Sequence, residues 1–238
     1  MKKLIIPYIQ SLNGASIERA GEILENAGKR EAVDKLNWAE AFPYRPITTF
    51  RIGYAGDGIY IKYDVHGSML RAIYTNDQDP VYEDSCVEFF CKRPGSEYYM
   101  NFEFNCIGTC LASKRKSRKE DVQRFSPDEM KLIERHSSLG RRAFLEMEGM
   151  FSWNLTVKIP FSLLGFAQGE TPDKLLGNFY KCADGTESPH YLSWSLIHTE
   201  NPNFHCPEFF GELWFETPNQ PLSPSGLSPQ GKEKGKKF

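Results

Sequence analysis

Apolar and polar residues alternate with a period of two from Thr48 to Val65, which is the pattern of β-strands buried on one face only. The turn sequence AGDG divides this stretch into two runs, so we predict a hairpin. Its apolar face would be formed by Phe50, Ile52, Tyr54, Ile59, Ile61, Tyr63 and Val65.

A second alternating stretch runs from Asp84 to Asn105 and predicts another hairpin, with a four-residue loop at Pro94–Glu97. The register in which the apolar side chains face one another also places Glu88 directly opposite Glu103. Two like charges side by side destabilise a sheet unless a cation, a shared proton or a bound ligand intervenes. The pattern therefore predicts a polar site built on a sheet. The apolar pairs of this register would be Val87 with Phe104 and Phe89 with Phe102.

Further strand patterns follow along the chain at Gly108–Ser113, Phe144–Met147, Trp153–Ile159, Leu176–Cys182, Tyr191–Ile197 and Phe210–Phe215. Together with the hairpins they give roughly nine or ten strands and few helices, for which two packed antiparallel sheets are the economical arrangement. We therefore predict an all-β fold, an antiparallel β-sandwich of the jelly-roll type.

Two short helices are predicted at the periphery of the sheets. Ser16 can cap a helix that runs to Ala27 with apolar residues at helical spacing. Ser126, which is followed by Pro127 and two acidic residues, begins a second helix that we expect to end near His136.

The chain has 238 residues, and all-β sandwiches of this size commonly form a single domain. We expect residues 1–35 to form an N-terminal extension that contains the first helix, and residues 36–216 to form the sandwich. Residues 217–238 are rich in Pro, Ser and Lys and are predicted to be a disordered tail.

The charge balance separates this tail from the rest of the chain. The net charge is −2, and the tail has four lysines and one glutamate (+3), so residues 1–216 carry −5. This balance gives no general attraction to nucleic acid or to a membrane, and no apolar run approaches the ~18 residues of a membrane-spanning helix. The basic run Lys114–Lys119 is followed by two acidic residues, so we interpret it as a solvated loop rather than a phosphate contact.

The apolar run near the N-terminus is interrupted by Pro7 and is too short for a signal-peptide core. The sequence as given predicts a cytoplasmic protein, or a periplasmic or secreted one if a leader has been removed. In the cytoplasm the cysteines would be reduced and buried in strands, whereas an oxidising compartment would favour up to three disulfides. The six cysteines are Cys86, Cys91, Cys106, Cys110, Cys182 and Cys206.

Several enzyme classes have no support in the sequence. No G-x-S-x-G, P-loop or G-x-G-x-x-G motif occurs, which argues against serine hydrolase, nucleotide hydrolase and Rossmann functions. No pair of histidines has the spacing of a helical zinc motif. The five histidines are His66, His136, His190, His198 and His205.

Several segments together resemble the family 9 carbohydrate-binding modules, in particular the bacterial single-domain branch called carbohydrate-binding family 9-like. The resemblance covers roughly residues 36–216 and implies a β-sandwich that binds sugars without catalysis, in polysaccharide utilisation beside glycoside hydrolases. The segments that carry it are Trp38–Ala39, FRIGYAGDGIYIKYDV (50–65), YEDSCVEFF (82–90), YYMNFEFNCIGT (98–109), WNLTVKIPFSLL (153–164), NFYKCAD (178–184) and YLSWSLIHTENPNFHCPEFFGELWFE (191–216).

In sugar-binding members of the family, two aromatic side chains clamp a terminal sugar ring, and carboxylate, amide and arginine groups bond its hydroxyls. The resemblance implies that Tyr82 and Phe204 form the clamp and that Glu88 is the hydroxyl-binding glutamate. This chain departs from the pattern twice, because Tyr82 replaces a tryptophan and Glu103 stands where members have an arginine. Members also carry structural calcium in acidic loops, but this sequence shows no complete ligand set.

The residue types themselves suit a mono- or oligosaccharide, because aromatic rings stack on the C–H faces of a pyranose and charged groups bond its hydroxyls. We therefore add Trp194 as a third stacking candidate, and Asn101 and His205 as hydroxyl partners. Structural roles remain open for these residues: sheet packing for the aromatic ones, a loop contact to backbone for His205, and for Glu88 a salt bridge to Arg51 or Arg71.

Two other functions are compatible with the same residues. Glu88 and Glu103 could be the acid and nucleophile of a glycosidase, because retaining enzymes hold two carboxyl groups ~5 to 5.5 Å apart. A sandwich that binds another protein is the third interpretation. Turnover of an aryl glycoside would indicate the enzyme, and capture of a partner hydrolase without sugar binding would indicate the interaction module.

Overall fold

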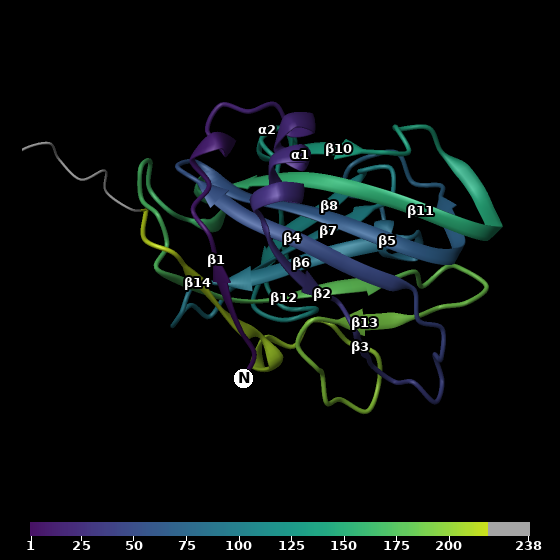
Figure 1. The fold of residues 1–238 in the computed structure, drawn as a ribbon. Coiled ribbons are helices and arrows are strands. Elements are labelled where there is room, and N and C mark those ends of the chain that lie inside the picture. The colour runs from purple at the N-terminus through teal and green to yellow at the C-terminus, as the bar shows by residue number, and fades with distance from the viewer. Residues whose placement is uncertain (219–238) are drawn as a thin grey trace, which may run out of the picture.

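The computed structural model describes residues 1–218 and shows two β-sheets packed face to face. Figure 1 shows β4, β5 and β11 in one layer and β6, β7 and β8 in the other. Helices are few and short, so the predicted β-sandwich is confirmed. None of the helices within the described residues is long and apolar enough to cross a membrane.

One sheet has five strands in the order β10-β11-β5-β4-β2. Its centre is the predicted hairpin around the turn AGDG. The two strands predicted at Phe144–Met147 and Trp153–Ile159 form one continuous strand, whose pairing with β5 contains two register shifts. The strands are β2 (Lys29–Ala32), β4 (Ile47–Ala55), β5 (Gly58–Ala72), β10 (Glu134–Ser137) and β11 (Phe144–Pro160).

The other sheet has nine strands, seven of them in the order β1-β14-β12-β6-β7-β8-β9, while β13 pairs with β12 and β3 with β13. Its pairs are antiparallel except for β1 with β14, which is parallel. The strands are β1 (Lys3–Ile6), β3 (Lys35–Leu36), β6 (Cys86–Lys92), β7 (Tyr99–Asn105), β8 (Cys110–Arg115), β9 (Gln123–Arg124), β12 (Lys174–Cys182), β13 (Tyr191–Ser193) and β14 (Gly211–Phe215).

The hairpin of β6 and β7 has the predicted register, in which Glu88 faces Glu103 and Phe89 faces Phe102. The connection is longer than expected, because the strands end at Lys92 and begin again at Tyr99. The register was predictable because a shift by one residue would have turned every apolar side chain of a strand away from the core.

The main core lies between the two sheets and is rich in aromatic rings. Phe50 from β4 stacks on Phe179 from β12 with ring centroids 3.9 Å apart, and Phe89 stacks on Phe179 at 4.9 Å. All six cysteines are free and buried, as expected for reduced thiols.

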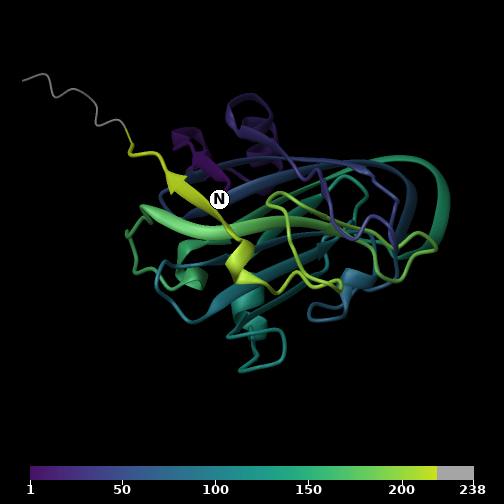
Figure 2. The ribbon, with the colours of Figure 1, turned by 90° about the horizontal axis from the view of Figure 1, so that it is seen from below.

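The first 35 residues are part of the sandwich rather than an extension. β1 pairs with β14 in one sheet, and β2 pairs with β4 in the other. Between them, α1 (Ile17–Ala27) contacts the outer side of β4, β5 and β11, and Figure 2 shows the helix outside this layer. As predicted, the Ser16 side chain caps this helix by accepting a hydrogen bond from the Arg19 N–H at 3.3 Å.

The second helix is shorter than predicted. α2 spans Pro127–Lys131, with a capping box between Ser126 and Glu129, and the chain enters β10 instead of continuing to His136. Single 3-10 turns also occur at η1 (Gln10–Leu12), η2 (Val81–Glu83), η3 (Phe161–Leu164) and η4 (Pro207–Phe209). Apart from its first two residues, the predicted disordered tail (217–238) lies outside the described residues.

Candidate functional site

The outer face of the nine-stranded sheet carries a pocket of about 320 Å³, within the size range of small-molecule sites. Strands β6, β7, β8 and β12 form its floor, and the segments after β8 and β13 form its walls. The lining residues are Tyr82, Glu88, Glu103, Leu111, Arg115, Arg118, Lys119, Val122, Arg124, Cys182, Asp184, Tyr191, Pro202, Asn203, Phe204 and His205.

Three carboxyl groups meet in this pocket. Glu88 and Glu103 are 2% and 4% exposed, and burial raises the pKa of both, to about 7 for Glu103 and well above the usual range for Glu88. The facing charge of Glu103 raises the pKa of Glu88 further. Burial also raises the pKa of Asp184 to about 6. At neutral pH these groups therefore carry fewer than three negative charges.

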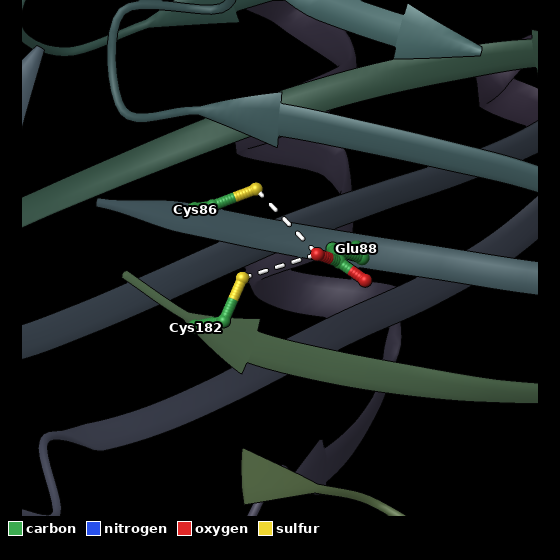
Figure 3. A group of neighbouring side chains, drawn as sticks. All are labelled: Cys86, Glu88 and Cys182. Carbon is green, nitrogen blue, oxygen red and sulfur yellow. Dashed lines mark hydrogen bonds between the residues drawn. The ribbon is translucent and has the colours of Figure 1, made fainter. Parts of the chain in front are cut away.

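Glu88 has no cation partner among the described residues. The arginines considered as alternatives pair elsewhere, Arg51 with Asp64 at 2.9 Å and Arg71 with Asp84 at 3.4 Å. Glu88 Oε1 instead accepts from the thiols of Cys182, at 3.1 Å, and Cys86, at 3.9 Å, as Figure 3 shows.

The second oxygen of Glu88 points away from both sulfurs and is buried without a hydrogen-bond partner among the described residues (Figure 3). A buried carboxyl oxygen that lacks a hydrogen-bond partner is costly. A hydroxyl group placed in the pocket could be this partner, because it can both donate and accept a hydrogen bond.

The ligand atoms of Cys86, Glu88 and Cys182 lie within 4.8 Å of one another and could hold a metal ion. Two sulfurs and one oxygen suit a thiophilic ion such as zinc, whereas calcium is held by oxygen ligands. Burial raises the pKa of both thiols, so they are protonated and act as hydrogen-bond donors to Glu88. Metal binding there would require both thiols to lose their protons.

Glu103 is held by a chain of buried polar side chains that leads to Arg115. Asn101 Nδ2 donates to Glu103 Oε1 at 2.8 Å, and Ser113 Oγ donates to Asn101 Oδ1 at 2.6 Å. Arg115 donates to the same Ser113 oxygen from Nε, at 2.9 Å, and from Nη2, at 2.6 Å. Asn101 is fully buried and does not line the pocket, so it positions Glu103 instead of bonding a ligand hydroxyl.

We interpreted the basic run Lys114–Lys119 as a solvated loop, and the structure corrects this for Arg115, which is the last residue of β8 and only 9% exposed. Arg118 and Lys119 lie in an exposed connecting segment, and they also line the pocket. Sequence reasoning missed Arg115 because the strand was expected to end at Ser113. Extending the alternation by two residues would have placed Arg115 on the face that carries Glu103.

The proposed clamp residues both line the pocket. Tyr82, in η2, is 37% exposed, while Phe204 is 8% exposed and stacks on Tyr180 with centroids 4.2 Å apart and planes 10° apart. Tyr191, which the sequence did not single out, lies against Phe204 with its ring nearly perpendicular. The pocket therefore combines one open aromatic ring with others that are fixed by packing.

His205 also lines the pocket, where its Nδ1 lies 2.9 Å from the hydroxyl of Tyr99. Burial, together with the nearby charges of Arg115 and Arg118, lowers the pKa of His205 to about 3. The ring is therefore neutral at physiological pH and can both donate and accept a hydrogen bond.

Trp194 is not part of this site. Its ring is fully buried in the main core, edge-on to Phe179 at 5.8 Å, and its Nε1–H donates to Glu31 at 3.0 Å. A ring without exposed surface offers no stacking platform, so the structure corrects this assignment.

Comparison with known proteins gives a consistent family match. The family described as carbohydrate-binding family 9 matches residues 21–215. No protein among the curated sequences matches the chain.

Solved structures with the same fold include a candidate carbohydrate-binding protein from Bacteroides uniformis. It is 37% identical, with a TM-score of 0.84, and the match covers 90% of this chain and 99% of that one. A family 9 carbohydrate-binding module from Caldicellulosiruptor kristjanssonii is similar at 10% identity in two structures. Its glucose complex has a TM-score of 0.59 over 94% of this chain and 100% of that one. Its cellotriose complex has a TM-score of 0.60 over 97% and 100%. At this identity the two complexes support the fold alone.

Proposed function

This chain belongs to carbohydrate-binding family 9, and from this premise we propose that the pocket on the outer face of its nine-stranded sheet binds a sugar. The binding is non-catalytic, and the ligand is a mono- or oligosaccharide. The observation that carries the proposal is that one pocket holds the open ring of Tyr82 and the buried carboxyl groups of Glu88 and Glu103.

Each part of the pocket has a role that follows from its chemistry. The exposed ring of Tyr82 offers an apolar face for the C–H groups of a pyranose, and Phe204 offers the second aromatic surface. The unsatisfied oxygen of Glu88 can form a hydrogen bond with a sugar hydroxyl, which can donate or accept. Neutral His205 can serve a second hydroxyl as donor or acceptor.

The test is a glycan array followed by calorimetry with the full chain, with and without calcium. We expect at least one sugar to bind, and the Glu88→Gln variant to lose at least about tenfold in affinity, because its amide replaces the carboxyl group that bonds a sugar hydroxyl. Glu97→Gln, in the exposed connection between β6 and β7, is the matched control and should bind like the unmodified chain. Absence of binding to every sugar, while the protein is folded, would contradict the proposal.

The glycosidase alternative rests on the same facing carboxyl groups and is tested in the same experiment. Turnover of any aryl glycoside that is lost in both Glu88→Gln and Glu103→Gln would establish catalysis and replace the binding proposal. We also propose that the protein acts beside glycoside hydrolases in polysaccharide utilisation, which pull-down with such a hydrolase would test.

A further inference from the structure

One wall of the sugar pocket is strongly basic. Of its lining residues, four carry a permanent positive charge, and they come from the end of β8, the segment after it, and β9. None of the four forms an ion pair within residues 1–218. They are Arg115, Arg118, Lys119 and Arg124.

Two basic residues that do not line the pocket form ion pairs with carboxylates. Lys116, in the same basic run, lies 3.3 Å from Glu97, and Arg135 lies 2.6 Å from Asp77. The pocket therefore gathers basic side chains that form no direct ion pair, whereas basic residues beside it are paired.

Arg115 is the most informative of the four. It is 9% exposed, and its guanidinium donates only to neutral oxygens within the described residues, the hydroxyl of Ser113 and the backbone carbonyl of Arg118. A buried charge is costly unless it is paired. These bonds use three of the five N–H donors of the guanidinium, which leaves two for a ligand.

The acidic groups of the pocket do not cancel this charge at neutral pH. Even with Glu88, Glu103 and Asp184 all ionised, the four basic side chains would outnumber them. Burial also raises the pKa of each carboxyl group, to about 7 for Glu103 and about 6 for Asp184, which reduces their negative charge. The pocket is therefore net positive when it is empty.

We infer that the bound sugar is acidic, a hexose unit that carries a carboxylate or a sulfate ester next to Arg115, Arg118 and Lys119. Its hydroxyls lie toward Glu88 and Glu103, and its ring stacks on Tyr82. This inference rests on the proposed function, because it names the class of sugar that the same pocket binds. The guanidinium fork suits a planar carboxylate, and the exposed Lys119 adds attraction that depends on ionic strength.

The experiment is calorimetry of the full chain with pairs of sugars in which one member has a carboxylate in place of the neutral CH2OH group at C6. Glucuronate and galacturonate are compared with glucose and galactose, and glucose 6-sulfate is the third arm. We expect an acidic sugar to bind at least about tenfold more tightly than its neutral parent, with an affinity that falls as salt is added.

Arg118→Gln should narrow the ratio of acidic to neutral affinity, while Lys114→Gln, the same change on β8 but outside the pocket lining, should leave the ratio unaltered. Arg118 is exposed, so its replacement does not endanger the fold. If glucose 6-sulfate binds tightly and the uronates do not, the result would support an acidic ligand and identify its charged group as a sulfate ester. Neutral sugars that bind as tightly as acidic ones would overturn the inference and leave the proposed function standing. No binding in any arm would contradict both.

Discussion

The two faces of the hairpin formed by β6 and β7 show how differently alternate residues of one strand can be used. Toward the five-stranded sheet, Phe89 and Phe102 are fully buried in an aromatic core. On the opposite face, Glu88 and Glu103 are almost as buried but belong to a polar pocket. The period of two therefore lets one hairpin supply both the core and the site.

This contrast shows that burial alone does not distinguish core from site. Burial of Phe89 stabilises the fold through apolar surface removed from water. Burial of Glu88 raises its pKa and leaves one oxygen unsatisfied among the described residues, so that side chain works against stability. We conclude that the inner face stabilises the sandwich, and that the outer face gives up stability to hold a ligand.

The largest effect is expected on the inner face. Phe89→Ala should lower the free energy of unfolding by about 3–5 kcal/mol, because it removes a fully buried ring and leaves a cavity between the sheets. Chemical denaturation measures the change, and Phe89→Leu, which keeps more volume, should cost less. A small effect of the alanine would mean that this face is not the main core.

The outer face should make stability depend on pH. Because folding raises the pKa of Glu103 from 4.5 to about 7, its contribution is full below pH 4.5 and is lost as the pH rises through 7. The shift corresponds to an upper limit of about 3 kcal/mol. Denaturation of the wild type and of Glu103→Gln at several pH values measures it, and the variant should lose less stability across this range. Parallel curves for the two proteins would contradict a buried, protonated Glu103.

The polar chain behind Glu103 should contribute to both stability and binding. Ser113→Ala removes the oxygen that accepts two Arg115 bonds, so we expect a loss of about 2 kcal/mol in the free energy of unfolding and weaker sugar binding. Ser117→Ala, at an exposed position two residues after Arg115, is the control. Unchanged affinity in Ser113→Ala would show that the orientation of Arg115 does not matter.

The smallest effect is expected for Trp194, and it tests whether this residue lies outside the binding site. Trp194→Phe removes the bond to Glu31 and part of a buried ring, which should cost about 1 kcal/mol of stability. Sugar affinity should not change, because Trp194 lies in the main core. A drop in affinity measured by calorimetry would place Trp194 at the binding site after all.

The sequence was sufficient to predict the sandwich and the register of the central hairpin, because both follow from alternation over long strands. It also indicated Tyr82, Glu88, Glu103, Phe204 and His205, which the structure gathers in one pocket. These residues could be predicted because each lies in a strand with clear alternation or in a segment that resembles the family.

The remaining errors arose where tertiary context decides. Trp194 looked like a stacking residue between two serines, but packing against Phe179 buries it completely. Arg118 and Asp184 reach the pocket from connecting segments, whose paths no periodicity predicts. The role of residues 1–35 was missed because β1 pairs with β14, about 200 residues later in the chain.

The most direct test of the account is a crystal structure of the chain with the tightest-binding sugar from the array. We predict that the sugar ring lies against Tyr82 in the outer-face pocket, with hydroxyls bonded to Glu88 and Glu103 and its charged group near Arg115. A sugar bound elsewhere, for instance in the shallow depression beside Trp194 and Phe209, would contradict the claim that the outer face of this hairpin is the binding surface.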